Sequence, residues 1–392
     1  MYMKKNKSIK LYIIAFLFLF SWNCNLIAQN KTDQLKKGIQ YKLDSLRENS
    51  GFPGATLALV LEDGRKINFA TDLSDPDKNI KMKPDDIMFT GSTGKTFVSA
   101  VVMQLYDEGK IDIDNKISNY FGKEEWFSKL SNSSDITVRM LLSHTGGVPR
   151  YVMKPDFWKK LSSEPDKVWE PVEILFYVFN EPPVHEPGKG WSYSDTDYII
   201  IGMIIEKICN NSYYNELKTR ILKPLELKNT FPSDQRELKG LIPGLTGPSP
   251  FQLPDKPVVD SKYIINPQFE WCGGGLVTTS PDLALWAKTL YESKVFSKNA
   301  LNELLKPHDF RTGQASKTGY GFGVFVFDTP SGLIYSHAGI FPGYETSMMY
   351  LTKFKTSLAV QINADSFSGK LNKTPDQILF EFIDLLSEYY KN

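Results

Sequence analysis

The chain has 392 residues, of which 41% are hydrophobic and 23% charged, and its formal net charge is +1. This composition is ordinary for a globular protein and excludes a low-complexity or disordered chain. A near-neutral chain also lacks the broad basic surface with which proteins bind nucleic acid, so nucleic acid is not an expected partner.

Residues 1–28 are typical of a signal peptide. Basic residues precede the apolar run Leu11–Phe20, and the small residue Ala28 offers a cleavage point before Gln29. The run is shorter than the ~20 residues of a transmembrane helix, so we expect a periplasmic or secreted protein with no stable membrane span. Loss of the four leader lysines lowers the net charge from +1 to −3. A lipoprotein anchored through Cys24 is the alternative.

Beyond the leader, the sequence contains few groups that bind metals. Cys209 and Cys272 remain, and a disulfide between them in an oxidising compartment stays open. The chain contains no Cys-x-x-Cys, and its four histidines are scattered. The sequence therefore predicts no metal site and no cofactor.

The elements at the N-terminal end come in the order helix, hairpin, helix. Apolar residues spaced for one helix face predict a first helix that ends near Gly51. Two β-type runs, 55–61 and 66–70, flank Asp63-Gly64 and predict a hairpin. A strongly apolar helix is then expected to begin at Ser92 and to end at Gly109.

The rest of the chain changes from helical to extended patterns. Residues 115–266 are mostly helical, with one apolar helix over 198–208. Successive strands are predicted over 323–328, 333–337, 346–351 and 357–362, and Thr374-Pro375-Asp376 opens a terminal helix. We therefore predict an α+β fold, in which an antiparallel sheet built from both ends of the chain is flanked by terminal helices and carries an inserted all-helical domain. The expected boundaries are 29–90 with 267–392 for the discontinuous sheet domain and 91–266 for the helical domain.

Ser92 and Lys95 form a Ser-x-x-Lys at the start of the apolar helix. Residues three apart on a helix share one face, so Lys95 is able to reach the Ser92 hydroxyl and to act as its base. Gly94-Lys95-Thr96 also looks like the end of a P-loop, but that motif needs a further glycine where this chain has Phe89. The pattern therefore favours a nucleophilic serine over a nucleotide site.

Two later segments complete a candidate active site. Tyr193 precedes the apolar helix, and a phenol near Lys95 would relay a proton between the serine and a leaving group. His337, Ala338 and Gly339 close a predicted strand. The backbone N–H of the next residue, Ile340, would then join that of Ser92 in an oxyanion hole.

These segments, in this order, resemble the serine β-lactamase and D-alanyl-D-alanine carboxypeptidase superfamily, in the branch with class C β-lactamases, related peptidases and family VIII esterases. The resemblance spans roughly 51–363 and rests on Phe89–Phe97, Leu105–Ile111, Ile136–Gly147, Pro187–Asp195, Gly273–Leu276 and His337–Gly339. It implies an acyl-enzyme mechanism in which Ser92 is assisted by Lys95 and Tyr193. Whether Lys95 or Tyr193 is the base stays open. His144 belongs to a loop motif of the family, and we assign His144 a structural role.

Two departures from the family pattern bear on the substrate. Asp195 stands where asparagine is usual, and an ionised carboxylate accepts hydrogen bonds but donates none. It would also favour the charged form of Lys95 and oppose a tyrosinate at Tyr193. His337 stands where β-lactamases usually have lysine, so the fixed positive charge there is reduced unless Asp195 raises the pKa of His337.

We expect Asp195, His337, Ala338 and Gly339 to line the substrate site. The two departures shift the expected activity from β-lactam hydrolysis toward a D-alanyl peptidase or carboxypeptidase acting on small-molecule or peptide substrates. A carboxylesterase of the same fold is the alternative, and a catalytically weak protein that binds β-lactams or peptides is a further one.

Overall fold

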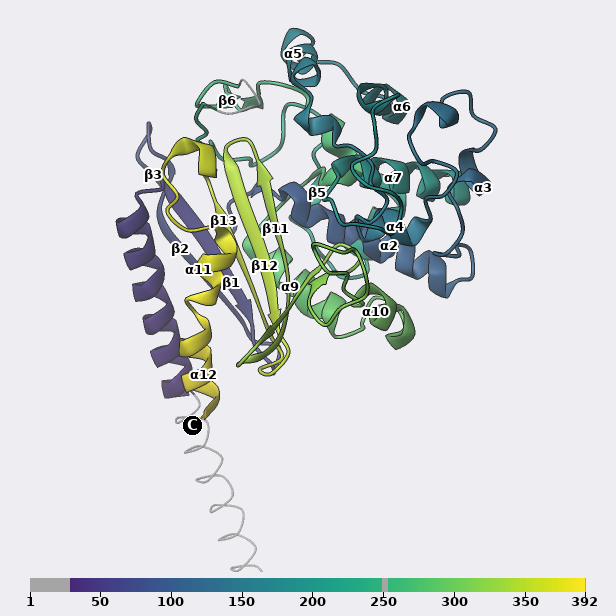
Figure 1. The fold of residues 1–392 in the computed structure, drawn as a ribbon. Helices are drawn as coiled ribbons and strands as arrows, with labels where there is room; N and C mark the ends of the chain where they lie inside the picture. Colours follow the sequence, from purple (N-terminus) through teal and green to yellow (C-terminus); the bar gives the residue numbers. More distant parts are fainter. Residues whose placement is uncertain (1–28, 249–252, 392) are drawn as a thin grey trace, which may run out of the picture.

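The computed structural model describes residues 29–248 and 253–391 of the chain (Figure 1). The predicted leader, its cleavage point at Ala28 and the alternative anchor Cys24 lie outside the described residues. Two layers of helix enclose a large sheet on one side of the molecule, and a mainly helical body lies on the other side (Figure 1).

The large sheet has eight strands in the order β3-β2-β1-β13-β12-β11-β10-β9. Strand β1 pairs antiparallel with both β2 and β13, so the two ends of the chain meet at the centre of the sheet. The strands are β1 (Gly54–Val60), β2 (Lys66–Asp75), β3 (Ile80–Lys81), β9 (Gly319–Tyr320), β10 (Phe325–Thr329), β11 (Gly332–Phe341), β12 (Tyr344–Leu351) and β13 (Thr356–Ile362). The predicted α+β class with an antiparallel sheet is confirmed.

Two small sheets lie outside the large one. Strand β8 (Leu276–Thr278) pairs with β4 (Met88–Phe89) and β5 (Phe231–Pro232). Strand β6 (Val258–Val259) pairs with β7 (Lys262–Tyr263). The pairing of β4 with β8 matters for function because the next residues after β4 contain Ser92.

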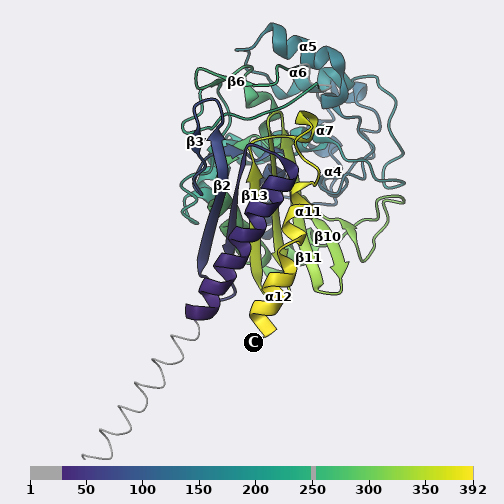
Figure 2. The same ribbon diagram turned by 90° about the vertical axis from the view of Figure 1, so that its left-hand side faces the viewer.

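A helix over residues 29–50 and the last two helices cover one face of the sheet (Figure 2). Helix α9 packs against the other face. The helices are α2 (Lys95–Asp107), α3 (Ser118–Phe121), α4 (Val138–Leu142), α5 (Pro155–Ser163), α6 (Pro171–Leu175), α7 (Asp195–Cys209), α8 (Tyr213–Leu217), α9 (Ser280–Tyr291), α10 (Lys298–Leu304), α11 (Pro375–Phe380) and α12 (Ile383–Lys391). Short 3-10 turns include η1 (Gly91–Gly94) and η6 (Pro267–Gly273).

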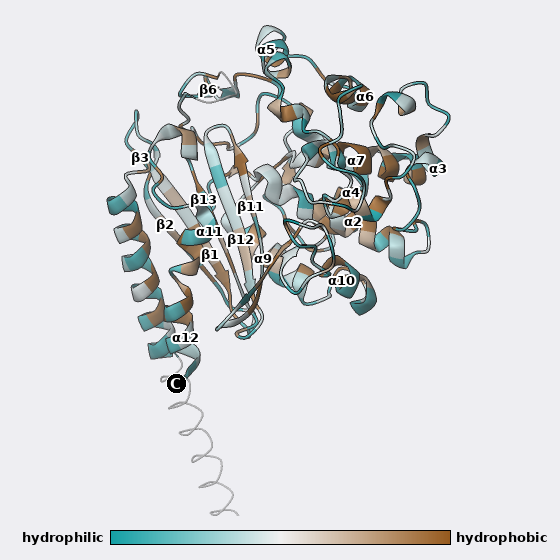
Figure 3. Ribbon diagram, viewed as in Figure 1, coloured by the Kyte–Doolittle hydropathy of each residue, from teal (hydrophilic) through white to brown (hydrophobic). Residues whose placement is uncertain are grey.

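Alternating side chains of β1 supply two separate cores. Leu57 and Leu59 pack in the cluster formed with the terminal helices, whereas Ala58 and Val60 belong to the cluster on the other face. Successive residues of a strand point to opposite faces, so a strand covered on both sides is apolar throughout. The apolar sides of the terminal helices face the sheet and their polar sides face solvent (Figure 3).

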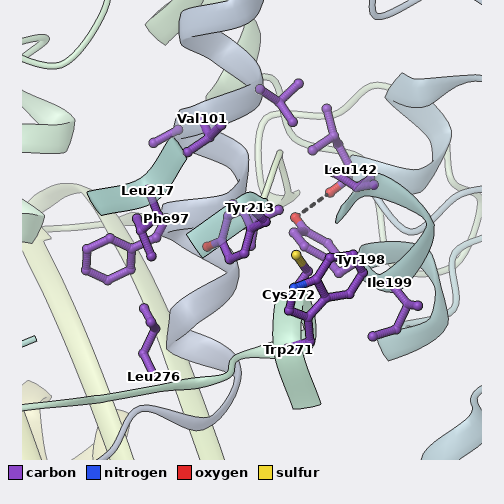
Figure 4. Packing of buried hydrophobic residues seen from close by; sticks show 14 of the residues in the cluster. Phe97, Val101, Leu142, Tyr198, Ile199, Tyr213, Leu217, Trp271, Cys272 and Leu276 are labelled. Atoms are coloured by element: carbon purple, nitrogen blue, oxygen red, sulfur yellow. Dashed lines mark hydrogen bonds between the residues drawn. The ribbon is translucent and has the colours of Figure 1, made fainter. Parts of the chain in front are cut away.

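The cluster that contains Ala58 and Val60 continues into the helical body. Phe97 and Val101 of α2 lie beside Tyr213 and Leu217 of α8 (Figure 4). The hydroxyl of Tyr198 donates to the carbonyl of Leu142 at 3.1 Å, which ties α7 to α4 (Figure 4). A single core therefore holds α2 and α7, the two helices whose first turns carry the candidate site.

The structure differs from the sequence predictions in two local details and answers the open question of a disulfide. Ser92 lies in the 3-10 turn η1, and the α-helix begins only at Lys95. Strand β11 continues past His337 to Phe341, so the histidine lies inside the strand instead of closing it. Cys209 and Cys272 are both free thiols, so the structure contains no disulfide between them.

Candidate active site

Ser92 lies in a turn that is fastened to β8. The Thr90 N–H donates to the carbonyl of Leu276 at 3.0 Å, and its hydroxyl donates to the carbonyl of Gly274 at 2.7 Å. The Thr93 hydroxyl in turn donates to the carbonyl of Thr90 at 2.6 Å. These bonds fix the backbone on both sides of Ser92, whose side chain is partly exposed. A rigid turn that presents one hydroxyl is what a nucleophile requires.

Lys95 is buried beneath that hydroxyl. Its Nζ lies 3.0 Å from Ser92 Oγ and 2.8 Å from Asp195 Oδ1, and it also donates to the carbonyl of Gly273. Three acceptors match the three N–H bonds of an ammonium group. The structure therefore joins Ser92, Lys95 and Asp195 in one hydrogen-bonded chain.

Asp195 is shared between two cations. Its second oxygen accepts from Arg150 Nε at 3.1 Å and from Arg150 Nη2 at 2.8 Å. Asp195 is also the first residue of α7, where the free N–H groups of the helix favour a negative charge. Burial alone would raise the pKa of Asp195, but the charges of Lys95 and Arg150 lower it, so the carboxyl is ionised.

The proton-transfer groups hold their protons in the resting site. Burial alone would lower the pKa of Lys95, but the adjacent charge of Asp195 outweighs it and the pKa is raised. Burial also raises the pKa of Tyr193, against the opposing effect of Lys95. Asp195 thus has the electrostatic effect expected of it, because it keeps Lys95 charged and opposes a tyrosinate.

Tyr193 lies against both cations. Lys95 Nζ is 4.9 Å from its ring centroid, and Arg150 Cζ is 5.3 Å away. The Tyr193 hydroxyl is buried and has no partner in hydrogen-bonding geometry among the described residues. The hydroxyl nevertheless interacts electrostatically with Ser92 and Lys95, so it is placed to exchange a proton with either of them.

His144 packs against the ring of Tyr193 and is fully buried. Its ring centroid is 4.3 Å from that of Tyr193, and its Nδ1 is 2.8 Å from Asp197 Oδ2. Burial lowers the pKa of His144 well below its usual value and raises that of Asp197 well above its own. The pair is therefore neutral, and its position under Tyr193 fits a structural role.

The expected oxyanion groups come from two adjacent segments. A Cβ added to Gly91 would lie 2.6 Å from Ile340 N, and one added to Gly339 would lie 2.7 Å from Ser92 N. Only glycine allows such close approach of the two backbones. Strand β10 pairs with β11 only as far as Ser336, so residues 337–341 of β11 are left to line η1.

His337 departs from the expected role of a positive charge. Its Nε2 lies 2.8 Å from Tyr320 Oη, its Nδ1 lies 2.7 Å from the carbonyl of Ala338, and the residue is 1% exposed. Burial, with the nearby charge of Lys95, lowers the pKa of His337 to about 3. The effect of Asp195, which was expected to raise this pKa, is too small to compensate. His337 is therefore neutral and bonded within the protein.

The structure adds three groups to the predicted site. Arg150 binds Asp195, the carbonyl of Gly273 accepts from Lys95, and the buried carboxyl of Glu270 lies nearby, with burial raising its pKa to about 8. None of the three has a fixed spacing from Ser92 in the sequence. The only signals in the sequence were two segments of the family resemblance: Gly273–Leu276, which contains Gly273, and Ile136–Gly147, which ends shortly before Arg150.

Two further features concern the described part of the chain. Within residues 29–248 and 253–391, no cluster of three or more His, Cys, Asp or Glu side chains could hold a metal ion. No helix in these same residues combines the length and apolar character needed to cross a membrane.

Comparison with known proteins assigns the family. The family model described as Beta-lactamase matches residues 39–380. Penicillin-binding protein 4* of Bacillus subtilis (strain 168) is 25% identical over 368 residues, which cover 90% of this chain and 77% of the relative. The chain thus belongs to the Beta-lactamase family of serine hydrolases and penicillin-binding proteins, as the resemblance predicted.

Solved structures with the same fold include a D-stereospecific amidohydrolase and a D-amino acid amidase. The D-stereospecific amidohydrolase from Streptomyces sp. has a TM-score of 0.72 and 26% identity, with 84% of this chain and 96% of that chain covered. The D-amino acid amidase from Ochrobactrum anthropi SV3 with L-phenylalanine amide has a TM-score of 0.74 and 25% identity, covering 92% and 99%.

Proposed function

We propose that this protein is a secreted serine hydrolase that cleaves amide bonds of D-amino-acid or D-alanyl peptide substrates through an acyl-enzyme on Ser92. The observation that carries the proposal is the distance of 3.0 Å between Lys95 Nζ and Ser92 Oγ, beside a buried Tyr193 hydroxyl. The names of the two amide-hydrolysing structural relatives support the substrate class.

Each step of the proposed reaction uses a described group. In the form of the site that has lost one proton from the Lys95–Tyr193 pair, Ser92 Oγ attacks the substrate carbonyl carbon while its own proton passes to that pair. The N–H groups of Ser92 and Ile340 stabilise the oxyanion. The C–N bond then breaks as the pair returns a proton to the leaving amine. Water attacks the resulting ester, giving the free acid and regenerating the Ser92 hydroxyl.

Domain organisation and location are part of the same proposal. The sheet domain, 29–90 with 267–392, and the helical domain, 91–266, would meet at Ser92, which suits a cleft between domains. The predicted signal peptide over 1–28 would deliver the enzyme to the periplasm or the exterior.

A parallel assay tests this function against its alternatives. A D-alanyl-D-alanine peptide, a D-amino acid amide, a nitrophenyl ester and a chromogenic cephalosporin are offered to the wild-type protein and to Ser92→Ala. We expect multiple turnover of the peptide or amide, a covalent adduct on Ser92 by mass spectrometry, and loss of both in Ser92→Ala. Much faster ester hydrolysis would establish the carboxylesterase, and adduct without turnover the binding protein. Activity retained in Ser92→Ala would overturn the mechanism.

A further inference from the structure

Arg150 is the charged side chain of the site that reaches solvent. Its side chain is 36% exposed, whereas that of Lys95 is fully buried and that of Asp195 is 10% exposed. Nε and Nη2 bind Asp195, and no hydrogen bond of Nη1 is found among the described residues. The outer edge of the guanidinium, between Nη1 and Nη2, is therefore available to a ligand.

The backbone around Arg150 is held on the first turn of α7. The carbonyl of Pro149 accepts from the hydroxyl of Thr196 at 2.7 Å, and the N–H of Tyr151 donates to that same hydroxyl at 3.1 Å. Both neighbours of Arg150 are thus fixed to the helix that carries Asp195. A cation held this firmly loses little freedom when it binds a partner, which favours binding.

The charges of the cluster leave a positive surplus. Lys95 and Arg150 are cations and face one ionised carboxylate, Asp195. The other titratable groups around them, Tyr193, His144, Asp197, His337 and Glu270, are neutral near pH 7 because of their burial. A site with surplus positive charge, exposed only at Arg150, attracts an anionic group of the substrate.

We propose that Arg150 binds a carboxylate of the substrate in a two-pronged contact on the helical-domain side of Ser92. This proposal rests on the proposed hydrolase function and implies a preference for those of its substrates that carry a carboxylate. Arginine suits the task because its planar fork matches a carboxylate. His337, which stands where β-lactamases usually have lysine, is buried and neutral, so the solvent-exposed positive charge of the cluster is that of Arg150.

Paired substrates test the proposal. Each pair shares one scissile bond and differs in one group, a carboxylate or its carboxamide, placed on the leaving amine in one pair and on the acyl part in the other. In Arg150→Gln we expect kcat/KM for the carboxylate member of one pair to fall at least about tenfold more than for its carboxamide, as loss of a charged hydrogen bond implies. The pair that responds shows which part carries the carboxylate.

Two matched variants distinguish binding of the substrate carboxylate by Arg150 from an indirect effect of Arg150 through Asp195. Arg150→Lys keeps the charge without the fork, and we expect it to recover part of the preference. Lys154→Gln removes a cation of the same loop that pairs with Glu181 at 2.9 Å, and the preference should stay as in the wild type. Equal losses for both members of each pair in Arg150→Gln would overturn the proposal, because Arg150 would then act only through Asp195.

Binding without turnover separates this proposal from the proposed function. Titration of Ser92→Ala with the members of both pairs should give tighter binding of the carboxylate member in the pair that responds, and the added substitution Arg150→Gln should abolish the difference. If the wild-type enzyme turns over no amide or peptide but this difference appears, the carboxylate site stands and the hydrolase function fails. Equal binding of the carboxylate and carboxamide members in both pairs would overturn the carboxylate site.

Discussion

At the scale of single residues, Asp195 sets the protonation of the site. It lies between Lys95 and Arg150, and its charge raises the pKa of both Lys95 and Tyr193. The competent form of the site has lost one proton from the Lys95–Tyr193 pair, so activity should rise with pH. The alkaline position of that rise is the consequence of an aspartate, and not an asparagine, at position 195.

Asp195→Asn should move the rise of kcat/KM to lower pH. Without the carboxylate, burial dominates at Lys95 and its pKa falls, and one charge in direct contact typically shifts a pKa by about 1–3 units. A pH profile from 5 to 10 measures the shift. Asp197→Asn is the matched control, because burial already keeps the Asp197 carboxyl neutral. An unmoved profile in Asp195→Asn would contradict the assignment.

Relative to the wild type, the Glu270→Gln variant should have a more favourable free energy of unfolding at pH 8 than at pH 5. The folded state raises the pKa of Glu270 from 4.5 to about 8, so it holds a proton that the unfolded chain has lost above about pH 5. The contribution of Glu270 to the stability of the wild-type protein therefore declines from about pH 4.5 to 8, on the order of 1.4 kcal/mol per pH unit. Glutamine has no such proton. Urea unfolding at pH 5 and 8 measures the difference in free energy of unfolding between Glu270→Gln and the wild-type protein. A difference that does not change with pH would refute the prediction.

At the scale of elements, the contact between β11 and η1 places the proposed oxyanion donors. Gly339 lies against Thr90 and Ser92, and a Cβ there would be 2.1 Å from the carbonyl oxygen of Thr90. Backbone atoms are unable to yield as a flexible side chain does, so a larger residue must push the strand away from the turn. The relative position of the Ser92 and Ile340 N–H groups therefore depends on the absence of a Cβ at Gly339.

Gly339→Ala should lower kcat by at least about 100-fold, the usual cost of losing one oxyanion donor, with a smaller change in KM. Steady-state kinetics with the substrate found in the parallel assay measure both constants. Gly38→Ala is the control, since its added Cβ would meet only the side chain of Leu385 at 3.4 Å. Normal kcat in Gly339→Ala would exclude the proposed role of the Ile340 N–H.

Prediction from the sequence succeeded where local pattern determines structure. Apolar spacing indicated the N-terminal helix and the four C-terminal strands, and family segments brought Ser92, Lys95 and Tyr193 together. Burial was not predictable, so the low pKa of His337 was missed. The pairing of Arg150 with Asp195 was missed too, because it joins residues 45 positions apart through a loop without a recognisable pattern.

At the scale of the whole molecule, the sheet has one core against the terminal helices and another against the site. Leu43 is fully buried in the first core, whereas Tyr41, two residues earlier, is 78% exposed. The helix over 29–50 therefore contributes to stability from the face of the sheet opposite α9. The active site lies in the second core.

Leu43→Ala should lower the free energy of unfolding by about 2–5 kcal/mol, the range for a large buried side chain cut to alanine. We expect kcat/KM per folded molecule to stay near the wild-type value. Denaturant unfolding and active-site titration measure the two quantities. Tyr41→Ala should change stability by less than about 0.5 kcal/mol, as exposed positions do. Equal effects of both substitutions would contradict the packing described.

The pairing of β1 with β13 has a consequence for biosynthesis. Ala55 lies opposite Ile362, so the centre of the sheet closes only after the intervening helical body has been made. Contacts so distant along the chain form slowly, and a growing chain must hold the edge of β1 that will pair with β13 exposed while translation proceeds. Nascent chains that end before β13 should thus depend on chaperones, and the nucleophile should become competent only late in folding.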